Sequence, residues 1–312
     1  MTSNDTKVLL VLSISILLST VFGILIPSIG ELFSPYILVI LGMLLFLNLI
    51  QLEFQDLVST FKKPRLLLIL SIMKVIVIPV TMYVVTSQVS PKHALPVLLL
   101  SGISTGLGAP FVTNYVGGKL SIIVGMVIVT SLAVPFILPM LVYVLYNTEF
   151  SIPIFDMIFL LVVSLVFPLV TSGLIKKYLP KLATRIKKSS LPLSIILMDM
   201  INFAIFSNFS FYFYFDSSFV ILTTVIAILL FAIFAITGYF MLYFIKRDSS
   251  IRYRISGLIV MSYVNNILVT VFAQQFFGSQ VAALAAFYNM PYYIGIILLK
   301  ILHSKLIRVS SE

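Results

Sequence analysis

Long apolar runs separated by short polar gaps extend along almost the whole chain. A helix needs about 20 mostly apolar residues to cross a bilayer, and ten runs reach this length. They cover residues 8–28, 35–52, 66–86, 94–115, 120–146, 153–175, 190–214, 218–245, 255–276 and 280–303. The pattern therefore predicts an all-α integral membrane protein with ten transmembrane helices that form one membrane domain.

The basic residues collect on one side of the predicted membrane. With the N-terminus inside, 18 of the 20 Lys and Arg residues lie on the inner side, and the exceptions are Lys74, within a run, and Lys92. Basic loops stay on the cytoplasmic side of a membrane. The distribution favours an even number of spans, in a multi-pass protein of the cell membrane whose N- and C-termini are cytoplasmic.

The ten runs form two sets of five, of which the first ends at residue 146 and the second begins at residue 153, and the most basic gap, Lys176 to Ser189, follows the sixth run. Because five is odd, the two halves have opposite orientations in the membrane, which is the arrangement of an inverted repeat. We place the first repeat and the start of the second in residues 1–180, with spans at 8–146 and 153–175. The rest of the second repeat occupies residues 181–312.

The fourth run of each half contains residues that interrupt a helix. Residues 101–115 include three glycines and Pro110, and residues 256–270 include two adjacent asparagines. Gly and Pro weaken a helix, and adjacent amides in hydrocarbon are costly unless they face a cavity or another helix. Broken helices at matching positions of inverted repeats form solute sites near the midplane. We expect such a substrate site to be formed by Thr105, Gly108, Asn114, Asn265 and Asn266.

Two charged residues lie inside predicted spans. Lys74 lies about 13 Å beyond Arg65, and Asp199 lies about 16 Å beyond Lys188, at about 1.5 Å per helical residue. A Lys at this depth costs about 2.5–3.5 kcal/mol on insertion scales, so it either snorkels to the inner headgroups or is a buried functional cation. Equal depth makes a Lys74–Asp199 ion pair possible, which could serve transport or only fix helix packing. Asn202 shares the helix face of Asp199.

Composition restricts the functional class. The chain is 61 % hydrophobic and 10 % charged, with a mean hydropathy of +1.18, whereas a soluble domain is about a quarter charged. The net charge of +10 is scattered over short gaps, which argues against a nucleic-acid partner. The sequence contains no cysteine and no nucleotide or catalytic-triad motif, and its two histidines lack a partner at metal-ligand spacing. We expect no enzyme, no cofactor and no metal site, and the partners are the lipid bilayer and a small-molecule solute. The oligomeric state is left open.

Several motifs keep the order and spacing of a known family. They are Gly42 to Leu49 followed by Lys63-Pro64-Arg65, then Gly106 to Tyr115 with Gly117-Gly118, and then Asn265-Asn266 followed by Phe277-Gly278. With these motifs the chain resembles the bile acid:sodium symporter family from about Ser34 to Ile301. The resemblance implies ten helices in which the broken spans four and nine cross. It also implies that spans one, two, six and seven form a panel beside a core of the other six.

The positions that bind sodium in this family differ in this chain. The family's Ser-Asn pair after the break in span four falls on Pro110 and Phe111. Its span-nine glutamate falls on Met261, and its span-three glutamine on Lys74. Sodium prefers several oxygen ligands, so the resemblance implies a site that has lost them. A Lys ammonium at this place would supply a fixed positive charge at the carbonyl ends of the crossed helices.

These observations predict a secondary transporter of a small organic solute, with an organic anion as the leading candidate, that works without sodium as a uniporter or with proton coupling. Lys74 would substitute for the cation and pair with Asp199 in one of two access states. One alternative is an efflux permease of the arsenite or auxin-carrier-like type, although the lack of cysteine argues against thiolate-dependent arsenite transport. Another is a non-transporting membrane sensor or scaffold of the same fold.

Overall fold

A computed structural model describes residues 3–51, 64–146, 153–246, 250–296 and 298–299, and these residues are almost entirely helical. The first half contains α1 (Ser3–Leu25), α2 (Pro27–Glu31), a 3-10 turn (Ser34–Tyr36), α3 (Ile37–Ile50), α5 (Pro64–Ile72), a π turn (Met73–Val77), α6 (Ile78–Val89), α7 (Pro91–Gly102), α8 (Ala109–Val116) and α9 (Leu120–Leu145). The second half contains α10 (Ile154–Leu161), a π turn (Val162–Val166), α11 (Phe167–Tyr178), α12 (Pro180–Phe215), α13 (Ser217–Lys246), α14 (Ile251–Ser262), α15 (Asn266–Phe277) and α16 (Ser279–Phe287). A last helical segment covers residues 289–296.

Six helical segments of the described chain are long and apolar enough to cross a membrane. They are Pro27–Ile50, Pro64–Val89, Leu120–Leu145, Ile154–Tyr178, Pro180–Phe215 and Ser217–Ile245. Large apolar side chains on their outer faces are exposed, such as Ile221 at 64 % and Ile236 at 58 % on α13, as expected for helices solvated by lipid. The chain is therefore an all-α membrane protein. The full count of ten spans and the inverted repeat stay predictions.

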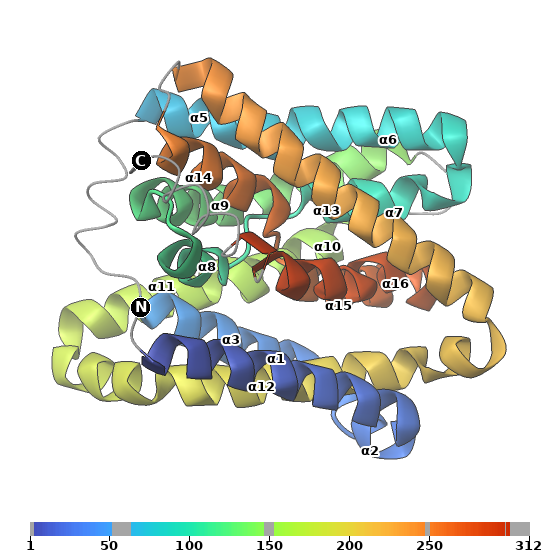
Figure 1. Ribbon diagram of the computed structural model, residues 1–312, viewed down its shortest axis with the longest axis horizontal. Coiled ribbons are helices and arrows are strands. Elements are labelled where there is room, and N and C mark those ends of the chain that lie inside the picture. Colours follow the sequence, from blue (N-terminus) through green and yellow to red (C-terminus); the bar gives the residue numbers. More distant parts are fainter. Residues whose placement is uncertain (1–2, 52–63, 147–152, 247–249, 297, 300–312) are drawn as a thin grey trace.

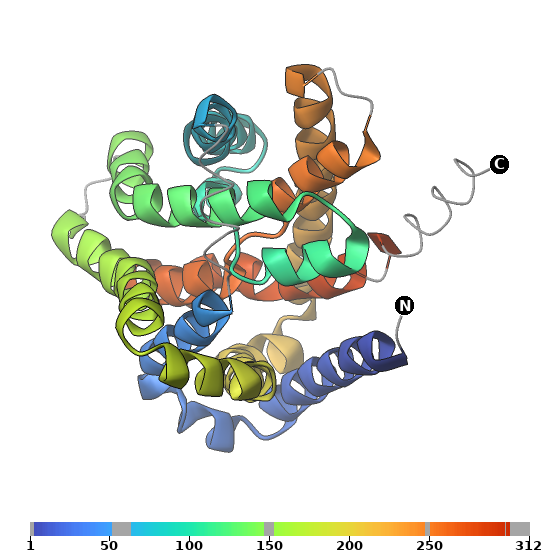
Figure 2. The ribbon, with the colours of Figure 1, turned by 90° about the vertical axis from the view of Figure 1, so that its left-hand side faces the viewer.

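The helices form two groups that lie one above the other in both Figure 1 and Figure 2. The group that we call the panel consists of α1, α2, α3, α11 and α12, in which α12 packs along α1, α2 and α3. The group that we call the core consists of α5 to α9, α13 to α16 and residues 289–296. Within it α13 packs on α14, α6 on α7, and α15 on α16. The panel helices belong to predicted spans one, two, six and seven.

The basic gap between predicted spans six and seven is mostly helical. Helix α12 begins at Pro180, ten residues before the predicted start at residue 190, and α11 ends at Tyr178. Leu179 alone separates the two helices, with φ −129° and ψ 57°. A proline in the first helical position has no amide hydrogen to leave unsatisfied, and Lys, Arg, Ala and Leu are good helix formers. The apolar pattern had predicted only the part of the helix that lies in hydrocarbon.

Two π turns interrupt long helices just before a proline. Met73–Val77 precedes Pro79, and Val162–Val166 precedes Pro168. A proline inside a helix removes a backbone donor and clashes with the preceding turn, and a π turn accommodates the lost hydrogen bond. The first of these turns contains Lys74, whose side chain is buried.

Candidate functional site

Two broken helices cross in the core and complete each other's backbone hydrogen bonds. Helix α7 ends at Gly102 and α8 begins at Ala109, while α14 ends at Ser262 and α15 begins at Asn266. The extended segments between them form one antiparallel bridge, between Thr105 and Val264. The amide of Gly106 donates to the Tyr263 carbonyl at 2.8 Å, and that of Asn265 to the Ser104 carbonyl at 3.0 Å. Each break thereby satisfies backbone groups that hydrocarbon would leave unpaired.

Glycine permits the close approach at this crossing. A Cβ at Gly106 would lie 2.7 Å from the Val264 carbonyl oxygen, and a Cβ at Gly108 would lie 2.7 Å from the Tyr292 hydroxyl. The glycines that weaken the fourth span therefore also make room for the ninth and the last.

The N-terminal ends of two half-helices face a cavity at the crossing. Its walls include Gly108, the N-cap of α8, and Asn266 and Ile267, the first residues of α15, and its volume is about 70 Å³. Asn265 caps α15, since its Oδ1 accepts from the Leu268 amide at 3.4 Å. Its Nδ2 is buried without a hydrogen-bond partner among the described residues, and the side chain is only 7 % exposed. Helix N-termini carry a partial positive charge, so an unused donor and two positive helix ends converge here.

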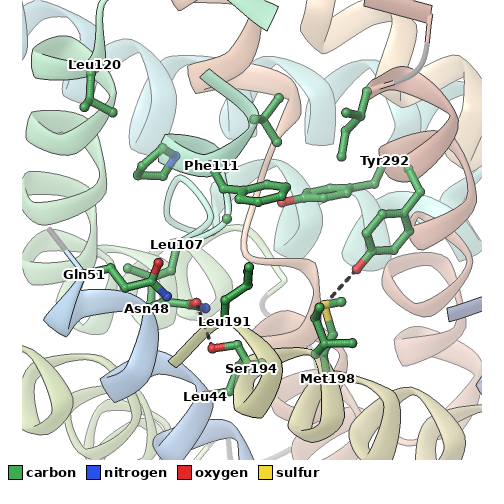
Figure 3. A pocket seen from close by; sticks show the side chains of 16 residues that line it. Leu44, Asn48, Gln51, Leu107, Phe111, Leu120, Leu191, Ser194, Met198 and Tyr292 are labelled. Atoms are coloured by element: carbon green, nitrogen blue, oxygen red, sulfur yellow. Dashed lines mark hydrogen bonds between the residues drawn. The ribbon is translucent and has the colours of Figure 1, made fainter. Parts of the chain in front are cut away.

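The crossing cavity shares the wall residues Asn48, Gly108 and Tyr292 with a larger cavity of about 280 Å³, which we call the Phe111 pocket (Figure 3). Phe111 and Tyr292 come from the core, whereas Asn48, Gln51 and Ser194 come from panel helices or their ends. The Ser194 hydroxyl donates to Asn48 Oδ1 at 3.4 Å. Neither cavity has a carboxylate or a basic side chain among the described residues that line it.

The carbonyl end of α14 receives the buried Lys74. Its ammonium donates to the Met261 carbonyl at 3.1 Å and lies 5.7 Å from the centre of the Phe234 ring. The side chain is 1 % exposed, so it does not snorkel to the membrane surface, whereas its role as a functional cation stays a prediction. A positive charge near the C-terminal end of a helix interacts favourably with the helix dipole. Lys74 therefore joins span three to the break in span nine.

Asp199 lies on the panel helix α12, and its carboxylate accepts a hydrogen bond from Ser15 of α1. In this conformation, no ion pair joins Asp199 to Lys74 within the part of the chain that the structure describes, and Asp199 Oδ1 is buried without a partner there. Pairing in another access state stays a prediction.

The structure places the other predicted site residues in different surroundings. Gly108, Asn265 and Asn266 line the crossing cavity. Thr105 is buried at the bridge, where its hydroxyl donates to the Val260 carbonyl at 3.1 Å, so it holds span four to span nine. The side chain of Asn114 lies outside the described part of the structure. Their role in binding stays a prediction.

Residues that the sequence analysis did not propose for solute binding contribute most of the cavity walls. They include Asn48, Phe111, Met198, Tyr292 and Tyr293. Asn48 could have been noticed in the sequence because it is an amide side chain within the apolar run 35–52. No periodicity distinguishes a cavity-lining aromatic side chain from one that packs in a core.

A family model described as the sodium bile acid symporter family matches residues 38–214, which is more than half of the chain. The chain belongs to this family. The match covers the Phe111 pocket's panel walls, the first broken helix and Lys74, whereas Asn265 and Asn266 lie beyond it. No curated protein matched the sequence. Family members are transporters and not enzymes, so this protein is a multi-pass membrane transporter.

Proposed function

We propose that the protein is a secondary carrier of a small organic anion with an apolar body, and that it works without sodium as a uniporter or with proton coupling. The observation that carries this proposal is the convergence of two half-helix N-termini and the Asn265 amide, which has no partner among the described residues, on a cavity whose described lining residues carry no charge. The family name points to bile-acid-like solutes.

An anionic group would be stabilised at the crossing by fixed dipoles. Each helix N-terminus acts as roughly half a positive charge, and no carboxylate among the described lining residues opposes it. The Asn265 Nδ2 offers a donor that a carboxylate or sulfonate could use. The walls of the Phe111 pocket, with Phe111, Tyr292 and Leu44, would hold the apolar body of the same solute.

Sodium independence is supported by the charge that already occupies the crossing. Lys74 Nζ contacts the carbonyl of Met261, and both residues stand where the family resemblance implies sodium ligands. A sodium ion about 4 Å from this ammonium would be repelled by about 4 kcal/mol at an effective dielectric constant of 20. Pro110 and Phe111 supply no side-chain oxygen that could offset this repulsion.

Flux measurements in proteoliposomes test the proposal. We expect uptake of tritiated taurocholate, competed by small aromatic carboxylates, that is the same in sodium and in potassium at fixed ionic strength. Stimulation by a pH gradient would assign proton coupling, and indifference to the gradient would assign uniport. A saturable increase that is specific for sodium would refute sodium independence, and the absence of flux for every anion would refute the carrier.

The finer architecture forms part of the same proposal. We infer a ten-helix inverted repeat, with spans one to five in the first repeat and spans six to ten in the second, and with both termini in the cytoplasm of a cell-membrane protein. The matching breaks in spans four and nine support the repeat, and the basic inner loops support the orientation. Because the chain has no natural cysteine, single cysteines placed in successive loops and labelled from one side of the membrane test both.

A further inference from the structure

Three buried asparagines join the core to the panel. Asn266, the first residue of α15, donates through Nδ2 to Asn289 Oδ1, and Asn289 Nδ2 donates to Asn202 Oδ1 on α12 at 3.4 Å. Asn202 Nδ2 in turn donates to Thr20 Oγ1 at 2.7 Å and to Ser19 Oγ at 2.9 Å on α1. We call Asn266, Asn289 and Asn202 the amide relay. Its middle bond is the one that connects core and panel.

A third cavity lies on the side of this relay opposite the crossing cavity and the Phe111 pocket. We call it the Gln274 pocket, and its volume is about 580 Å³. It is bounded by both groups of helices, and its walls include Ser34, Ile205, Asn208, Thr270 and Gln274.

The relay lies between the two cavities along both helices that carry its ends. On α12, Met198 lines the Phe111 pocket and Ile205 the Gln274 pocket, with Asn202 between them. On α15, Asn266 lines the crossing cavity, whereas Thr270 lines the Gln274 pocket. At 1.5 Å per residue, the four residues on α15 correspond to about 6 Å and the seven on α12 to about 10 Å. The barrier between the cavities is therefore about one to two helical turns thick, and the relay crosses it.

We propose that the amide relay is the latch that keeps this barrier closed, and that Asn289 is the residue that positions Asn266 and links it to the panel. Movement of the core along the panel must break the Asn289–Asn202 bond, and a buried amide without a partner is destabilised in a medium that offers no water. This step rests on the proposed function. Solute contact with Asn266 is coupled to the latch, because Asn266 both contacts the solute and donates a hydrogen bond to Asn289. By linkage, whatever weakens the latch changes solute binding reciprocally.

Accessibility of single cysteines tests the latch without any solute. Met198→Cys reports the crossing cavity and Thr270→Cys the Gln274 pocket, in a chain that has no other cysteine. A membrane-impermeant methanethiosulfonate reagent is applied from each side of sealed vesicles. With the relay intact, we expect each cysteine to react from one side of the membrane. Asn289→Leu should raise the rate from the opposite side about fivefold, which equals about 1 kcal/mol at 1.4 kcal/mol per tenfold change.

Two further variants separate the latch from a general loss of packing. Asn202→Leu removes the same interdomain bond from the panel side, so its effect should not add to that of Asn289→Leu. Tyr214→Phe on the same helix removes a hydrogen bond to the Ile24 carbonyl of α1 within the panel, away from the residues that line the cavities, and should leave access from the opposite side unchanged. Equal rates in the parent and in both relay variants, in protein that elutes as a single species, would overturn the proposal. So would an equal rise in the Tyr214→Phe control.

A covalent link provides a measurement that does not depend on destabilised variants. In Asn202→Cys/Asn289→Cys, a short bifunctional methanethiosulfonate should close the latch and stop tritiated taurocholate exchange, and reduction should restore it. Exchange that continues after complete cross-linking would contradict the latch. In Asn289→Leu and Asn202→Leu, which lack the bond between core and panel, the maximal exchange rate should rise more than KM changes, whereas Asn266→Ala, which leaves that bond in place, should act mainly on KM. Failure to transport taurocholate refutes the substrate proposal alone, because the accessibility rates need no solute.

Discussion

The substitution Lys74→Gln separates the functional role of the buried ammonium from its effect on stability. The change removes the 3.1 Å hydrogen bond to the Met261 carbonyl. A hydrogen bond to a charged group contributes about 1.5–3 kcal/mol. The change also removes a cation whose insertion costs about 2.5–3.5 kcal/mol. These two effects have opposite signs and similar size, so the net change in unfolding free energy should be within about 1 kcal/mol.

Transport should respond much more strongly than stability. Without Lys74 the carbonyl end of α14 loses its positive charge, and under the proposed pairing with Asp199 the two access states lose a charged contact that would differ between them. A difference of about 1.5–3 kcal/mol corresponds to a roughly tenfold to hundredfold loss of flux. The assay is initial-rate uptake of tritiated taurocholate per mole of reconstituted protein, with thermal unfolding followed on the same sample.

A matched control exists elsewhere in the chain. Lys176 donates to the Leu49 carbonyl at the end of α3, at 2.7 Å, far in sequence from the crossing. Lys176→Gln removes the same kind of charged cap from a helix end, and its flux should stay within about twofold of the parent. Parental flux in Lys74→Gln, or an equal loss in Lys176→Gln, would refute the reasoning about the crossing.

Three further predictions concern the crossing and its surroundings. Asn266→Ala should raise the apparent KM for taurocholate about fivefold to tenfold, the effect of one hydrogen bond, in protein that remains monodisperse; an unchanged KM would exclude Asn266 from the site. Gly106→Ala places a Cβ 2.7 Å from the Val264 carbonyl oxygen and should lower the unfolding free energy by about 1–3 kcal/mol. Denaturation in detergent measures this change, and Gly173→Ala is the control because a Cβ there meets nothing within 4 Å. Asp199→Asn should partly restore flux to Lys74→Gln if the two residues pair in one access state, whereas additive effects in this double-mutant cycle would show that they are uncoupled.

The apolar pattern was sufficient for the class of fold because the cost of moving a segment into hydrocarbon depends mainly on that segment's own side chains. Six predicted spans overlap the six long apolar helices of the structure. The breaks in spans four and nine were also predictable, since Gly, Pro and adjacent Asn residues act on the local backbone. The start of α12 at Pro180 was missed because the helix continues into a basic stretch that hydropathy treats as a gap.

The sequence could not predict which residues from distant parts of the chain form hydrogen bonds with each other. Depth alone allowed Lys74 to snorkel or to pair with Asp199, yet the packing places its ammonium against the Met261 carbonyl, close to the end of a helix from the other half of the chain. Asn202 was noticed only as a neighbour of Asp199, and its bond to Asn289 joins residues 87 positions apart.

The sequence by itself determined which segments enter the membrane and where two of them break, because these properties follow from local transfer free energies and backbone propensities. The tertiary structure alone decided which polar groups meet at the crossing, which cavity they face and which amide donor remains unpaired. The physical reason is that a buried polar group takes whichever partner the packing of distant helices brings within hydrogen-bond distance, and a pattern along one chain does not contain that distance.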